Sequence, residues 1–115
     1  MPLSLLFLLE MINVPSHQMC NVVLVLNSAR FALGYSDYQS GGGGSFAGPE
    51  RLTAKNERWA CADDMFKAKS SCRQIVYPQQ LFVGSASHPW GLNPVHYKPA
   101  YYEFFWNELA RLVGI

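Results

Sequence analysis

The last third of the chain constrains the fold most, because it predicts a strand, a stiff loop and a long helix in succession. Residues 81–83 form a short apolar run that ends in small residues, which is typical of a strand reaching the rim of a sheet. Two prolines and a glycine stiffen the next loop, so that His88 and Leu92 are presented on a rigid scaffold. From Pro99 onward, apolar residues recur at three- and four-residue steps, which predicts a helix capped by Gly114.

A second strand is predicted near the start of the chain. Residues 21–27 contain consecutive branched apolar residues, which favours a strand covered on both faces, as in a parallel sheet. Ser28 is suited to cap a short helix over residues 29–33, so the chain shows the usual α/β unit. We therefore expect residues 22–26 and 81–83 to be neighbours or near neighbours in one parallel sheet, with their carboxyl ends at a shared rim.

The middle of the chain predicts a loop followed by a helix. Residues 35–49 include four consecutive glycines, which favour a flexible surface loop because glycine loses much backbone entropy inside an element. These glycines lack the pattern of a phosphate-binding loop. Residues 50–69 predict a moderate helix, on which Asp63 and Asp64 are expected to face solvent. A small edge strand is predicted over residues 75–77.

Composition sets the class of molecule. A chain of 115 residues that is 50% hydrophobic predicts a single small α/β domain over residues 1–115, with a small parallel-type sheet flanked by helices. The net charge of +1 excludes a global field that would recruit nucleic acid, so any such binding must be local. Three cysteines favour a reduced intracellular chain, either cytoplasmic or nuclear, although one disulfide plus a free thiol stays open. We expect no cofactor and no metal, since His17 and Cys20 have no second ligand pair.

The apolar run over residues 3–12 has two interpretations. It predicts a buried core helix, because no basic residue precedes it and Glu10 interrupts it. If residues 1–19 are instead a signal peptide, the protein is secreted. The run is too short to span a membrane, and no membrane association is expected.

Residues 88–92, His-Pro-Trp-Gly-Leu, resemble the C-terminal His-Pro-Ser-Pro-Leu motif of uracil-DNA glycosylases. That motif also lies between a strand and a closing helix, and residues 105–114 resemble the last helix of the family. Upstream, the strand ending at Asn27 is similar to the family strand whose terminal asparagine reads the uracil edge. The water-activating Gly-Gln-Asp-Pro-Tyr motif is absent. The resemblance therefore implies a glycosylase-like fold and function, in an active enzyme or in a truncated, diverged or inactive relative.

The resemblance implies a site for an extruded uracil base in DNA. His88 would stabilise the leaving group as a neutral donor, in cleavage of the N-glycosidic bond. Asn27 would read the base, Leu92 would fill the space that the base vacates, and Ser87 would also contact the substrate. Local basic residues, such as Lys98 and Arg30, are expected to meet DNA phosphates.

A non-enzymatic protein–protein interaction module is the alternative hypothesis. The predicted apolar face of the last helix consists of Tyr102, Phe105, Trp106, Leu109, Leu112 and Val113. Further aromatic residues lie outside this face, at Tyr97, Tyr101 and Phe104. Aromatic residues on two sides of a helix predict burial within the fold, against a protein partner or in a homo-oligomer.

Overall fold

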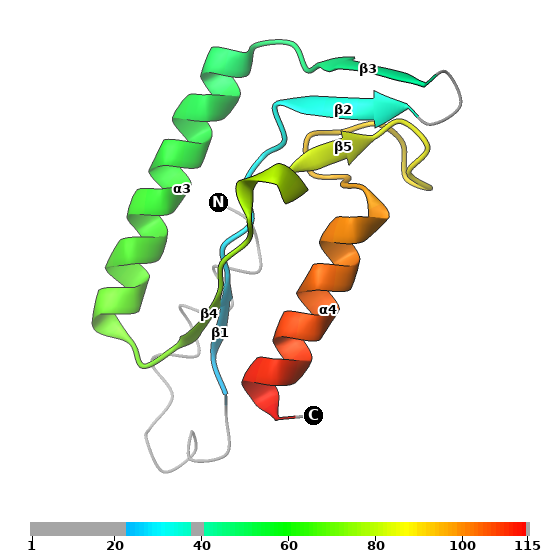
Figure 1. Ribbon diagram of the computed structural model, residues 1–115. Coiled ribbons are helices and arrows are strands. Elements are labelled where there is room, and N and C mark those ends of the chain that lie inside the picture. The colour runs from blue at the N-terminus through cyan, green and yellow to red at the C-terminus, as the bar shows by residue number, and fades with distance from the viewer. Residues whose placement is uncertain (1–22, 38–40, 115) are drawn as a thin grey trace.

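The computed structural model of the protein describes residues 23–37 and 41–114, so the expectations for residues 1–19 and for the pair His17 and Cys20 lie outside the described part. Two long helices flank a set of short strands (Figure 1). The α/β class is therefore confirmed, with a mixed rather than strictly parallel arrangement. In chain order the elements are β1 (Val25–Asn27), β2 (Gly34–Asp37), β3 (Gly42–Ser45), α3 (Pro49–Lys69), β4 (Arg73–Ile75), the 3-10 helix η1 (Gln79–Leu81), β5 (Val83–Ser85) and α4 (Pro99–Val113).

The strands form two sheets, and both contain a parallel pair. β1 pairs with β4 in one sheet, whereas β2 pairs with β5 and with the antiparallel β3 in the other. The pairing of Val25 with Arg73 spans 48 positions, whereas that of Gly34 with Val83 spans 49. Residues 25–36 and 73–85 thus run side by side through both sheets. Between the two pairings, the second stretch has one residue more than the first.

The predicted pairing of residues 22–26 with residues 81–83 is wrong. β1 takes β4 as its partner, and β5 lies in the other sheet. The later strand also begins two residues after its predicted start, because η1 takes up the chain as far as Leu81. The small strand predicted over residues 75–77 forms instead as β4, and its last residue, Ile75, is fully buried.

The helix predicted over residues 29–33 does not form. The backbone N–H of Phe31 donates to Oδ1 of Asn56 at 2.7 Å, and Nδ2 of Asn56 donates back to the Phe31 carbonyl at 3.0 Å. The next N–H, of Ala32, donates to the Pro94 carbonyl at 2.8 Å. Since distant groups satisfy this backbone, the segment has no need of helical bonds.

The glycine-rich stretch is not only a loop, as predicted, because it contributes β3 and pairs with β2. A Cβ atom built on Gly43 would lie 2.3 Å from the Tyr35 carbonyl oxygen. One built on Gly44 would lie 2.8 Å from the hydroxyl oxygen of Tyr35. The glycines therefore permit a close approach that any larger residue would block.

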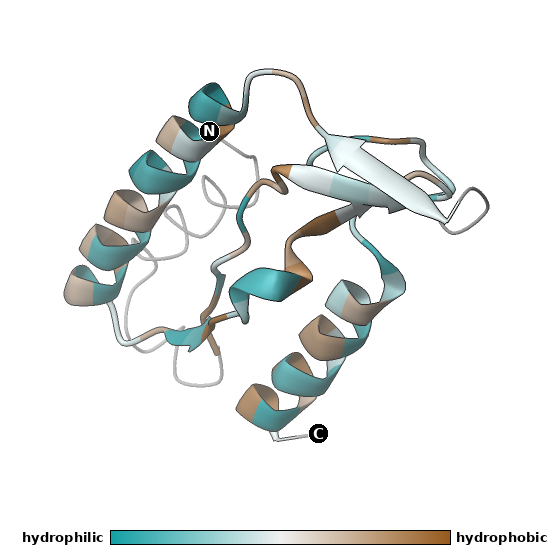
Figure 2. Cartoon of the chain, turned by 45° about the horizontal axis from the view of Figure 1, so that its top comes forward, coloured by the Kyte–Doolittle hydropathy of each residue, from teal (hydrophilic) through white to brown (hydrophobic). Residues whose placement is uncertain are grey.

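The two long helices agree with the prediction. α3 begins with Pro49 after Gly48, and α4 begins with Pro99 and ends at Gly114, whose φ of 77° is the left-handed cap expected of glycine. Figure 2 shows that the most hydrophobic stretch of extended chain, just before β5, lies between the two helices. None of the described helices has the length and hydropathy needed to cross a bilayer.

One exposed position on α3 was predicted wrongly. Asp63 is 4% exposed, and its Oδ2 atom lies 2.7 Å from Nη2 of Arg30, whereas Asp64 faces solvent. The ion pair joins α3 to the extended chain after β1, where Asn56 also holds Phe31. Burial of Asp63 follows from this partner 33 positions away, which local helical periodicity does not reveal.

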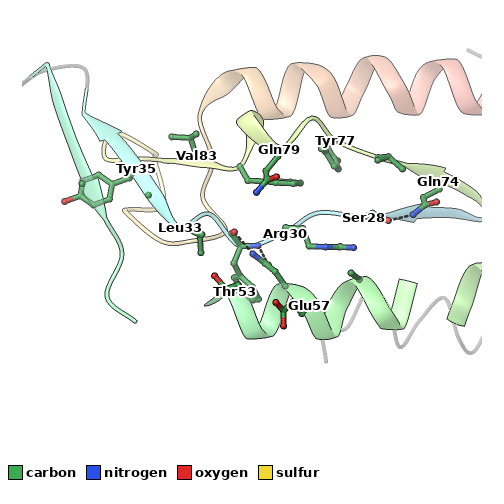
Figure 3. Close-up of a pocket in the computed structure, with 17 residues that line it drawn as sticks. Ser28, Arg30, Leu33, Tyr35, Thr53, Glu57, Gln74, Tyr77, Gln79 and Val83 are labelled. Carbon is green, nitrogen blue, oxygen red and sulfur yellow. Dashed lines mark hydrogen bonds between the residues drawn. The ribbon is translucent and has the colours of Figure 1, made fainter. Parts of the chain in front are cut away.

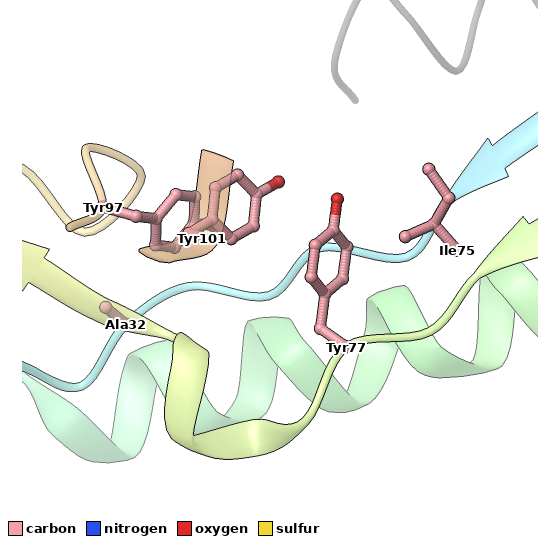
Figure 4. Close-up of a cluster of buried hydrophobic side chains, with 5 residues drawn as sticks. All are labelled: Ala32, Ile75, Tyr77, Tyr97 and Tyr101. Carbon is pink, nitrogen blue, oxygen red and sulfur yellow. The ribbon is translucent and has the colours of Figure 1, made fainter. Parts of the chain in front are cut away.

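A stack of tyrosines forms most of the larger core (Figure 4). The Tyr101 ring lies 4.0 Å from that of Tyr97 and 4.8 Å from that of Tyr77, measured between centroids. Burial raises the pKa of the Tyr77 and Tyr97 hydroxyls well above the usual range. Tyr101 is the buried residue of α4, whereas Trp106, predicted on its apolar face, is 64% exposed.

Candidate nucleic-acid interface

The predicted site loop follows β5 and returns along its edge. We call residues 86–98 the aromatic loop. Its second half is fixed to the sheet: the Ser85 N–H donates to the His96 carbonyl, and the Lys98 N–H donates to the Val83 carbonyl, both at 3.0 Å. Gly84 also forms an antiparallel bridge with Tyr97. The loop is therefore held at both ends against one short strand.

Turns inside the aromatic loop fix its tip. The N–H of His88 donates to the Ser85 carbonyl at 3.3 Å, and that of Gly91 donates to the His88 carbonyl at 2.9 Å. Gly91 has a φ of +91°, a conformation that favours glycine. Further along, the Asn93 side chain accepts from the Val95 N–H at 3.1 Å. The stiff presentation expected from the prolines and glycine thus has a hydrogen-bonded basis.

The hydrogen bonds of His88 define its neutral form. Its Nδ1 accepts a bond from the Trp90 backbone N–H at 3.1 Å. In the neutral ring Nε2 must then carry the proton, and it donates to the Tyr102 hydroxyl oxygen at 3.0 Å. The same oxygen accepts from the Tyr97 N–H at 3.3 Å. The one N–H donor of neutral His88 is therefore already engaged by Tyr102 of α4.

A second histidine stacks on the first. The rings of His88 and His96 lie 4.6 Å apart between centroids and are inclined by only 15°. The His96 Nδ1 atom lies 2.8 Å from the Gly91 carbonyl oxygen, and because that oxygen only accepts, Nδ1 carries a proton. Burial and the neighbouring His96 both lower the pKa of His88, so the neutral ring is the favoured state.

Apolar side chains at the tip of the loop remain open to solvent. Trp90 is 82% exposed, Leu92 44% and Val95 42%. Ser87 is also exposed, while the side chain of Ser85 is buried beneath it, with the two hydroxyl oxygens 3.3 Å apart. The predicted residues His88, Ser87 and Leu92 therefore belong to one exposed loop.

The stretch of chain that contains this loop carries charged side chains of one sign. Residues 65–102 contain four lysines or arginines and no aspartate or glutamate. This stretch therefore has no carboxylate that would repel a phosphate. It would accept an acidic surface of a protein partner equally well. Of these four basic residues, Lys98 lies in the aromatic loop itself, so this stretch offers an anion one basic side chain at the loop.

Asn27 does not belong to the aromatic loop. It lies at the end of β1, in the other sheet, and its Oδ1 accepts a hydrogen bond from the Tyr77 hydroxyl at 2.5 Å. Three stacked or tilted tyrosines, Tyr77, Tyr101 and Tyr102, connect it to His88. The two residues expected to hold one base are therefore separated by aromatic core.

Arg30 was also predicted to meet phosphates, and its contacts contradict this. Its guanidinium pairs with Asp63 and also donates to the Ala29 carbonyl at 2.9 Å. It lines a groove of about 700 Å³ between α3 and the extended chain (Figure 3). Gln74 and Glu57 line the same groove, and Gln74 donates to the Ser28 hydroxyl at 2.8 Å. The groove has mixed polar and apolar walls and an arginine whose charge is already matched.

Two residues of the candidate site were not foreseen from the sequence. His96 and Tyr102 complete the hydrogen bonding and stacking of His88. The recurrence of histidine on either side of a stretch that contains two prolines and a glycine is the signal that could have indicated a closed loop. Within the described residues, no group of three or more His, Cys, Asp or Glu side chains is placed to hold a metal ion.

Comparisons with protein-family models, with curated proteins and with solved structures found no match.

Proposed function

We propose that the protein binds DNA through the aromatic loop and holds an unstacked base against its rings, as a diverged relative of the uracil-DNA glycosylases. The observation that carries this proposal is Trp90, a large ring 82% exposed on a loop with a fixed backbone. The absence of acidic residues from positions 65–102 also suits a negatively charged ligand such as DNA.

The energetics favour single-stranded or locally opened DNA. Stacking of a base on an exposed aromatic ring contributes about 1–3 kcal/mol, whereas extruding a base from a duplex costs a few kcal/mol. Leu92 lies close to Trp90 in the chain and is exposed, so it is available to occupy the space of an extruded base. A strand that is already open avoids the extrusion step and should bind more tightly.

Two features favour binding without rapid cleavage. The Nε2 proton of neutral His88 donates to Tyr102, so it must leave that bond before it can stabilise a departing uracil. Asn27 lies in the other sheet and accepts a hydrogen bond from Tyr77, so it is not available to the same base. We therefore propose slow or absent hydrolysis of the N-glycosidic bond.

A binding experiment with labelled oligonucleotides tests the proposal. Trp90→Ala should weaken binding of a uracil-containing single strand by about 5- to 150-fold, the equivalent of one lost stacking contact. Trp106→Ala is the matched control, because it removes another exposed tryptophan, 64% exposed on α4. Equal affinity of the two variants, or no binding by the wild-type chain, would overturn the assignment.

A cleavage assay then separates catalysis from binding. If the protein cleaves, His88→Ala should reduce product formation more than affinity, and Leu92→Ala should weaken binding to duplex more than to single strands. Binding of wild-type protein without product would identify a non-catalytic relative.

Trp106 supports the second candidate, a protein interaction module. An exposed tryptophan on a helix is a frequent anchor at protein interfaces. If α4 mediates self-association, wild-type protein should elute as an oligomer and Trp106→Ala as a monomer. A monomeric wild-type chain excludes the homo-oligomer.

A further inference from the structure

We propose that His88 and His96 form a proton-sensitive latch, which holds the tip of the aromatic loop while both rings are neutral and releases it when His88 is protonated. The structural half of this proposal stands on the hydrogen bonds of the loop. Its consequence for DNA rests on the proposed function.

The first step is the bond from Trp90 to His88. Nδ1 of His88 accepts the Trp90 backbone N–H, and Nε2 donates to the Tyr102 hydroxyl. A protonated imidazole carries a hydrogen on both nitrogens and accepts at neither. Protonation therefore leaves the Tyr102 bond intact and removes the acceptor that holds the Trp90 backbone.

The second step is the stack. A positive His88 lies face to face with His96, whose Nδ1 proton is committed to the Gly91 carbonyl. Any charge on His96 then lies within 4.6 Å of the charge on His88, measured between ring centroids. Because Gly91 follows Trp90 directly, both histidines act on the same turn of the loop.

The surroundings offer the new charge little compensation. From α4 the group that contacts His88 is the Tyr102 hydroxyl, and the loop itself supplies His96. β5 contributes Ser85, which does not titrate. Lys98 at the base of the loop has the same sign, and His96 lowers the pKa of His88 in addition to burial. Acidification thus weakens the latch in two ways: it removes the acceptor of the Trp90 N–H, and it places a positive charge in the histidine stack.

The latch makes a prediction opposite in sign to simple charge attraction. Protonated histidines beside a phosphate would strengthen DNA binding in acid. Release of the turn that positions Trp90 weakens it instead. The direction of the change in affinity between pH 7.5 and pH 5 therefore distinguishes the two.

The first experiment uses the free protein and needs no ligand. Amide hydrogen exchange of Trp90, corrected for the intrinsic rate, should lose roughly two- to tenfold in protection between pH 7.5 and pH 5, as expected for one hydrogen bond. His88→Asn is the informative variant, because its Oδ1 takes the place of Nδ1 as acceptor and does not protonate. The Trp90 amide of this variant should keep its protection at both pH values.

The second variant tests the stack. His96→Asn retains a donor for the Gly91 carbonyl through Nδ2 and removes the second imidazole ring. The loss of Trp90 protection should then occur at higher pH than in the wild-type chain, because His96 lowers the pKa of His88 and its removal makes His88 easier to protonate. An unchanged midpoint would remove His96 from the latch.

Protection at Trp90 that is equal at pH 7.5 and pH 5 in the wild-type chain overturns the latch, whatever the DNA result. If protection falls as expected, single-stranded DNA affinity should fall with it in the wild type and stay constant in His88→Asn. Affinity that rises in acid in both proteins would also contradict the latch as a regulator of binding. A wild-type chain that loses protection but never binds DNA refutes the proposed function alone.

Discussion

Replacing the buried Asp63 with asparagine should destabilise the fold more than any other change of a single charge on α3. The side chains of Asp63 and Arg30 are 5% and 19% exposed, and their charged atoms lie 2.7 Å apart. Removing one member of a buried pair costs about 3–5 kcal/mol, because the other charge stays desolvated. Since Arg30 keeps partial contact with solvent and a bond to the Ala29 carbonyl, we expect the lower end, about 3 kcal/mol.

Urea denaturation followed by circular dichroism measures this loss. With a slope of about 1.5 kcal/mol per molar urea, the midpoint of Asp63→Asn should fall by about 2 M. Asp64→Asn is the matched control, since it removes the same charge from the adjacent exposed position and should change stability by less than about 0.5 kcal/mol. Equal losses in the two variants would refute the reasoning. Recovery in an Arg30→Met, Asp63→Leu double variant would identify the unmatched charge as the cause.

Three further predictions follow from single contacts. Asn56→Ala should lower the unfolding free energy by about 1–3 kcal/mol in urea melts, because two hydrogen bonds to one backbone residue are lost. Gly84→Ala should lower the melting temperature, since its new Cβ would lie 2.8 Å from the Phe46 ring. The pKa of His88 is lowered by burial and by His96, so its contribution to stability should be complete above about pH 6.5 and be lost as the pH falls through the folded-state pKa. Urea midpoints at pH 7.5 and pH 5 check this, and His88→Asn should reduce their difference.

The helices could be predicted from the sequence because their signals are local. Pro99 and Gly114 mark the two ends of α4 within a single amphipathic stretch. Strand partners depend on contacts between distant segments, and strands of three or four residues have too few side chains to specify them. Residues 81–83 are apolar enough for a strand, yet part of them enters η1. The sequences of β4 and β5 therefore do not by themselves determine which of them pairs with β1.

The candidate site divides in the same way. A local motif identified His88, and the neighbouring residues of the same loop were assigned to the site together with it. His96 joins the site because the chain turns back along β5, and Tyr102 joins it because α4 places the Tyr102 hydroxyl within hydrogen-bonding distance of His88. Asn27 was grouped with His88 on the assumption of one sheet, and the division into two sheets separates them. An assignment based on spacing along the chain therefore holds within one loop and fails between two strands.

The tyrosine core limits what a DNA substrate could contact. Tyr77 holds Asn27 at one end of the core, and Tyr102 holds His88 at the other, while Tyr101 packs against both tyrosines. A base stacked at the aromatic loop would have to displace buried rings before it could reach Asn27. Such displacement would expose apolar surface at about 25 cal/mol per Å², which a single pair of hydrogen bonds to the base does not offset. Recognition of a base at this loop must therefore come from stacking and from the edge of the loop itself, so affinity should differ little between uracil and thymine.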